Sequence, residues 1–69
     1  MEKEYVIYVE DGVDNTGFVM NFDCVAGIVN FNTTRILGRA LRLPMERANA
    51  LFDKIDTERR PVGIRMFEW

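Results

Sequence analysis

Three arginines, Arg35, Arg39 and Arg42, stand at spacings of four and three residues, and they are the side chains best suited to bind a charged ligand. If residues 33–43 were helical, the three guanidinium groups would share one face. Arginine pairs bidentately with phosphate or carboxylate, so this face could grip a nucleic acid or the acids of a partner protein. It could also be solvated, or paired within the chain with Glu2, Glu4 and Glu10. The net charge of −2 disfavours a dedicated nucleic-acid domain, because such domains are usually basic.

Catalytic chemistry has few candidates in this chain. The sequence contains no Ser, His or Gln, which removes the common nucleophile and base pairings. Cys24 follows Asp23 and precedes Val25, a setting that does not activate a thiol, so we expect it to be buried and structural. A single cysteine excludes an internal disulfide and, without histidine, argues against zinc. We therefore expect no enzyme activity, no metal and no cofactor.

An acidic hairpin around Glu10, Asp11 and Asp14 is the second charged feature. Calcium is not expected there, because the third and twelfth positions from Asp11 are Val13 and Phe22. Residues 1–31 carry six acids and one Lys, whereas residues 32–69 carry eight cations and five acids. The acidic half could imitate a phosphate string and dock on a basic groove, or it could be a solubilising rim.

The hydrophobic pattern predicts a single α+β domain over residues 1–69. The stretches 4–10, 17–22, 24–31 and 62–69 are typical of strands, with a join near Asp23 and Phe18, Met20 and Phe22 on one side. Residues 35–40 could form one or two helical turns. Apolar residues at a spacing of three to four predict an amphipathic helix at about 44–56. We expect a small antiparallel sheet of three to four strands packed on this helix, with the first and last strands adjacent.

Aromatic residues exceed what one helix can cover. The predicted first and last strands are apolar on both sides, so one sheet face must be covered by the irregular segment, by a second copy or by a partner. Tyr8, Phe67 and Trp69 are therefore candidate partner-binding residues, together with the three arginines. No apolar run approaches the ~20 residues of a membrane helix. We expect no membrane association and a cytoplasmic protein.

The stretch ALRLPMERANALFDKID followed by VGIRMFEW, within residues 40–69, resembles the C-terminal half of small accessory proteins of phages and mobile elements. This group includes inhibitors of bacterial defence systems such as anti-CRISPRs. The resemblance implies a host or defence protein as partner, and the host cytoplasm as location. It carries over no binding residue, because no site motif is shared.

Together these features favour a non-catalytic protein-binding module that inhibits its target by steric occlusion. Two alternatives stay open. The chain could be a nucleic-acid-binding accessory protein that uses Arg35, Arg39 and Arg42, or a structural homodimer without a heterologous partner.

Overall fold

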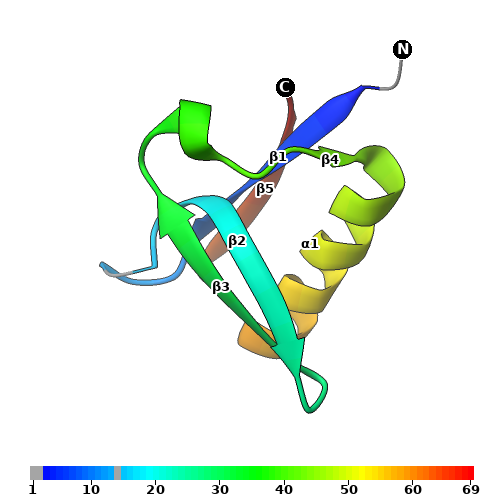
Figure 1. The fold of residues 1–69 in the computed structure, drawn as a ribbon. Helices are drawn as coiled ribbons and strands as arrows, with labels where there is room; N and C mark the ends of the chain where they lie inside the picture. Colours follow the sequence, from blue (N-terminus) through cyan, green and yellow to red (C-terminus); the bar gives the residue numbers. More distant parts are fainter. Residues whose placement is uncertain (1–2, 14) are drawn as a thin grey trace.

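The computed structural model describes residues 3–13 and 15–69, and within them one α-helix packs on an antiparallel five-stranded sheet (Figure 1). The elements are β1 (Glu4–Glu10), β2 (Gly17–Val25), β3 (Ile28–Thr34), the 3-10 turn η1 (Leu37–Arg39), β4 (Leu43–Pro44), α1 (Met45–Arg59) and β5 (Gly63–Glu68). The predicted α+β class is confirmed. The extra strand relative to the prediction is β4, whose two residues are too few to leave a periodic signal. No helix among the described residues is long and apolar enough to cross a bilayer.

Strand β1 lies in the middle of the sheet. One edge pairs with β5 from Tyr5–Glu68 to Glu10–Gly63, which confirms that the first and last strands are adjacent. The other edge is divided, because β2 pairs with Tyr8 and Val9 while β4 pairs with Glu4 and Tyr5. Strand β2 therefore stays beside β1 for only two residue pairs and then diverges with β3 as a separate hairpin (Figure 1).

A bulge between Val19 and Asn21 changes which side chains of β2 face the helix. Val19 is buried in the core, and Phe22 pairs with the core residue Phe31, so both lie on the helix side of the sheet. Phe18 pairs with Tyr8 on the other side. The prediction that Phe18, Met20 and Phe22 share a face is wrong, because the extra residue of a bulge shifts the alternation by one position.

The core forms where α1 packs against the concave side of the sheet. Helix residues at a spacing of three and four meet apolar side chains from four strands, and the buried cluster contains Ile7, Val9, Val19, Val29, Phe31, Leu43, Ala48, Leu51 and Ile55. Burying one large aliphatic side chain contributes roughly 1.5–3 kcal/mol. The predicted apolar helix face consists of Met45, Ala48, Leu51, Phe52 and Ile55. Ala48, Leu51 and Ile55 are buried and Phe52 packs against the core, as predicted, whereas Met45 in the first turn is 52% exposed.

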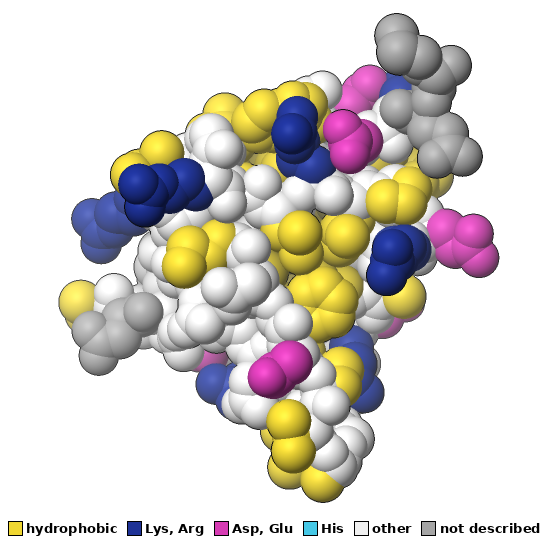
Figure 2. Space-filling view, viewed as in Figure 1, with side chains coloured by type: hydrophobic (Ala, Val, Ile, Leu, Met, Phe, Trp, Pro, Cys, Tyr) yellow, Lys and Arg dark blue, Asp and Glu magenta, His cyan; other side chains and the backbone are white. Residues whose placement is uncertain are grey.

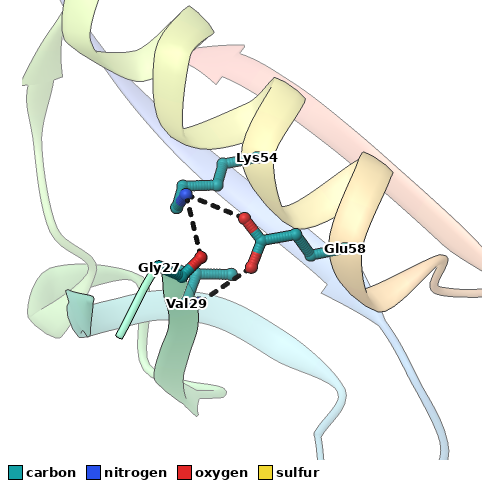
Figure 3. A network of polar contacts seen from close by, with 4 residues as sticks. All are labelled: Gly27, Val29, Lys54 and Glu58. Atoms are coloured by element: carbon teal, nitrogen blue, oxygen red, sulfur yellow. Dashed lines mark hydrogen bonds and ion pairs between the residues drawn. The ribbon is translucent and has the colours of Figure 1, made fainter. Parts of the chain in front are cut away.

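A network of polar contacts fastens the tip of the β2–β3 hairpin to α1 (Figure 3). The Glu58 carboxylate accepts a hydrogen bond from the Val29 backbone N–H at 3.0 Å and pairs with Lys54 Nζ at 2.8 Å. Lys54 also donates to the Gly27 carbonyl at 3.3 Å. The hydrogen bonds from Lys54 and from Val29 hold the pKa of Glu58 below its usual 4.5, and the bond to Glu58 raises the pKa of Lys54 above 10.5.

The helix extends one turn beyond the predicted range of about 44–56. Pro44 is extended and precedes α1, and Arg60 ends the helix in a left-handed conformation just before Pro61. The added turn carries Glu58, which binds β3, and Arg59, whose guanidinium lies 5.6 Å from the centre of the Phe31 ring. Contacts with the hairpin thus stabilise a turn that the polar sequence does not favour.

Two further local predictions are wrong, those for the hairpin turn and for the burial of Cys24, and a third is confirmed only in part. The hairpin turns at Ala26-Gly27, not near Asp23, and both turn residues have positive φ. Of the one or two helical turns predicted over residues 35–40, one short 3-10 turn forms, η1, and it is flanked by extended Ile36 and Ala40. Cys24 is exposed, because α1 covers its buried partner Val29 on β3 but not the neighbouring position on β2.

We expect Gly17→Ala to lower the free energy of unfolding by about 2 kcal/mol or more. A Cβ at Gly17 would lie 2.6 Å from the Thr34 carbonyl oxygen, and its φ of +150° strains any other residue. Gly38→Ala is the matched control, because a Cβ there meets nothing within 4 Å. Urea unfolding of both variants provides the measurement, and equal stability of the two would contradict the β2–β3 register.

We expect the network at Glu58 to make stability depend on pH in the acidic range. Because folding lowers the pKa of Glu58, its contribution is present above the unfolded pKa near 4.5 and is lost as pH falls through the lower folded value. Glu58→Gln should therefore lose less stability than the wild type between neutral pH and pH ~3. Thermal melts across this range test it, with Asp56→Asn as the control from the same helix.

Candidate protein-binding face

The sheet has a second side that faces away from α1. On β1, Tyr5, Ile7 and Val9 pack with the core beneath the helix. Side chains alternate along a strand, so Val6 and Tyr8 lie on the opposite side. Residues paired directly across antiparallel strands share a face, which adds the partners of Val6 and Tyr8 on β2 and β5 to this side.

Tyr8 stands at the centre of this second side. Its cross-strand partners are Phe18 on β2 and Arg65 on β5. The Tyr8 and Phe18 rings meet edge to face, with centroids 5.2 Å apart and planes at 73°. This geometry is a favourable one for aromatic pairs, so the two rings hold each other in place.

Phe67 and Trp69 extend the same side towards the end of the chain. Phe67 pairs with Val6, and the Trp69 backbone N–H donates to the Glu4 carbonyl at 2.7 Å, which continues the ladder beyond β5. The Arg42 guanidinium lies 4.9 Å from the centre of the Trp69 ring, a cation–π contact. We call the resulting surface the aromatic face, and it consists of Tyr8, Phe18, Arg42, Arg65, Phe67 and Trp69.

The aromatic face is open to solvent at its edge and buried beneath. Phe67 is 45% and Trp69 48% exposed. Val6, the cross-strand partner of Phe67 on β1, is only 2% exposed. Tyr8 and Phe18 are half-buried. The irregular segment before β4 contributes Arg42 but leaves these large rings accessible. The sequence predicts that this side is covered by the irregular segment, by a second copy or by a partner. The irregular segment covers it in part, through Arg42.

The three predicted arginines do not form a single patch. Extended backbone at Ile36 and Ala40 prevents the helical spacing that would align them. Arg42 reaches the aromatic face, Arg39 is exposed on η1, and Arg35 lines a shallow cleft beside Glu10 and the loop that precedes β2.

Ion pairs of these arginines with Glu4 and Glu10, one of the alternatives that the sequence left open, do not form among the described residues. The ion pairs of residues 3–13 and 15–69 are Lys3–Glu68 at 3.5 Å and Lys54–Glu58. Glu2 lies outside the described residues. The side chains of Arg35 and Arg39 are exposed to solvent.

The acidic hairpin is only partly described. Glu10 is exposed at the end of β1 and Asp11 is half-buried in the following loop, while Asp14 lies outside the described residues. The described part of the chain has no cluster of three or more Asp, Glu, Cys or His side chains that could hold a metal ion.

Sequence reasoning brought Tyr8, Arg42, Phe67 and Trp69 forward as binding residues, and the structure places these four together. It missed Phe18 and Arg65. The signal for Phe18 was its position just after the loop that joins the first two strands, which allows it to pair with Tyr8. Arg65 lies two residues before Phe67 on the last strand and therefore on the same side, so the alternation that singled out Phe67 also points to Arg65.

Comparison of the chain with protein-family models, curated proteins and solved structures gave no match. The resemblance of residues 40–69 to phage accessory proteins therefore stays a prediction from the sequence.

We expect the exposed rings of the aromatic face to contribute little to stability. Phe67→Ala and Trp69→Ala should each cost about 1 kcal/mol or less, whereas Ile55→Ala, which empties a fully buried position, should cost roughly 2–5 kcal/mol. Urea unfolding followed by circular dichroism measures all three. A cost at Phe67 or Trp69 equal to that at Ile55 would make the two rings core residues.

Proposed function

We propose that this protein is a non-catalytic protein-binding module whose aromatic face docks on a partner protein and occludes its working surface. The observation that carries the proposal is the grouping of four aromatic rings and two guanidinium groups on the sheet face that α1 leaves uncovered. Tyr, Trp and Arg are the residues most enriched at the energetic centres of protein interfaces.

The total accessible surface supports an interface as well. The chain exposes 4892 Å², roughly 10% more than the ~4,450 Å² typical of a monomer of its 8.0 kDa mass. Phe67 and Trp69 are half-exposed. Covering them with a partner would remove apolar area from water without unfolding any element of the domain.

The partner class comes from the resemblance of residues 40–69. Because of this resemblance, the first partner to test is a host or defence protein in the host cytoplasm. Arg42 and Arg65 frame the rings on this face, so an acidic rim on the partner would steer association and fix its orientation.

A homodimer without a heterologous partner is the second candidate, and the outer edge of β5 favours it. Within the described residues β5 pairs only with β1, so its other edge is free for a second copy. The nucleic-acid alternative gains no support from the arginines, because Arg35, Arg39 and Arg42 do not share one surface.

A pull-down from host lysate tests the proposal, with nuclease-treated and untreated halves and three baits. The baits are the wild type, the double variant Phe67→Ala/Trp69→Ala, and Met45→Ala as a matched control. Met45 is 52% exposed and lies at the start of α1. We expect one stoichiometric protein that survives nuclease and that the double variant loses by at least about tenfold, while Met45→Ala retains it.

Other outcomes would contradict this function. Partners that vanish with nuclease would favour nucleic-acid binding, and a partner retained by the double variant would remove the aromatic face from the interface. If only the bait returns and its melting temperature rises with protein concentration, the homodimer takes precedence.

A further inference from the structure

The divergence of β2 from β1 leaves a strand edge without a partner. On that edge the Val19 carbonyl accepts a hydrogen bond from the Leu41 N–H at 2.9 Å, and in the described chain no strand pairs with the edge beyond this point. The opposite edge of β2 pairs with β3 as far as Val25. Every second residue from Met20 to Val25 therefore directs its backbone N–H and C=O away from β3.

A groove lies between this stretch of β2 and the helix. It encloses about 200 Å³, and its lining residues come from β2, β4 and α1, namely Phe22, Leu43, Arg47, Ala50, Leu51 and Lys54. Figure 2 shows hydrophobic side chains gathered between β2 and α1 in the middle of this face, with Lys and Arg side chains beside them. We call it the β2–α1 groove.

The chemistry of the β2–α1 groove is apolar with a positive rim. Two cations and no carboxylate line it. Lys54 is engaged by Glu58 and the Gly27 carbonyl, whereas Arg47 is exposed and has no ion pair among residues 3–13 and 15–69. Arg47 thus provides a guanidinium that can pair with an acid brought in by a ligand.

The size of the groove selects the kind of ligand. Sites for drug-sized molecules usually enclose ~300–1,000 Å³, so this one is small for a free metabolite. It suits a single large apolar side chain. A free strand edge beside a pocket for one side chain is the arrangement used in recognition by strand addition, where the edge provides affinity and the pocket provides specificity.

We propose that the β2–α1 groove binds an extended segment of a partner protein, which adds as a strand to the free edge of β2. The segment places one large apolar side chain between Phe22, Leu43 and Leu51, and an acidic residue beside it pairs with Arg47. This site is separate from the aromatic face, because Phe22 lies on the helix side of the sheet and Phe18 on the other. The inference about the β2–α1 groove does not depend on whether the aromatic face binds a partner.

Selection from a random octapeptide library on the full-length protein tests this inference. Ala50→Trp fills the groove from an exposed helix position, and Asn49→Trp adds the same ring to an exposed neighbour that does not line it. We expect enriched peptides with a large apolar residue next to Asp or Glu. Their affinity should fall at least about tenfold with Ala50→Trp and stay within about twofold with Asn49→Trp.

A charge-reversal experiment and amide hydrogen exchange distinguish strand addition from other modes of binding. A selected peptide with its acids replaced by Lys should bind Arg47→Glu better than it binds the wild type. Amide protons on the free edge between Met20 and Val25 should become protected from exchange when the original peptide binds.

Several results would overturn the inference. The wild type could enrich no peptides beyond those that Ala50→Trp enriches. The enriched peptides could lack acidic residues. Binding of a selected peptide could protect amide protons of β1 and β5 only, and not those of β2. Circular dichroism spectra identical to the wild type are required of each variant, so that loss of binding cannot come from loss of folding.

Discussion

The arrangement of the molecule depends on how the edge of β1 is divided. On this edge of the seven-residue strand β1, two residues pair with β2 at one end and two with β4 at the other, and the two strands cannot occupy the same stretch of edge. Strand β2 separates from β1 after Phe18, and the bulge at Val19–Asn21 turns its next aromatic residue towards the helix. The free edge of β2, the β2–α1 groove and the separation of Phe18 from Phe22 all follow from this division.

The hairpin that leaves the sheet is held by the helix. Its tip would be a two-stranded ribbon of marginal stability if it stood alone. Val29 and Phe31 pack into the core, and Glu58 and Lys54 bind the backbone of Val29 and Gly27. Because these contacts join β3 to the last turns of α1, the spacing between β2 and the helix is set by packing and not by a loop.

In the described part of the chain one α-helix is available to cover the sheet, and α1 occupies one side of it. The rings on the other side remain half-exposed over the buried Val6, in a domain that buries only about 60% of the surface its unfolded chain would expose. The aromatic face and the β2–α1 groove therefore lie on different sides of the molecule. The two proposed binding sites therefore do not overlap.

The sequence by itself determined the fold class, the helix and the adjacency of the first and last strands, because periodic apolar residues such as Ala48, Leu51 and Ile55 encode a local face. It also singled out Tyr8, Phe67 and Trp69, since their strands are apolar on both sides. The tertiary structure alone decided the bulge, the turn at Ala26-Gly27, the exposure of Cys24 and the separation of the arginines. These features depend on which strand pairs with which stretch of β1 and on what α1 can reach, and contacts between distant residues leave no local period.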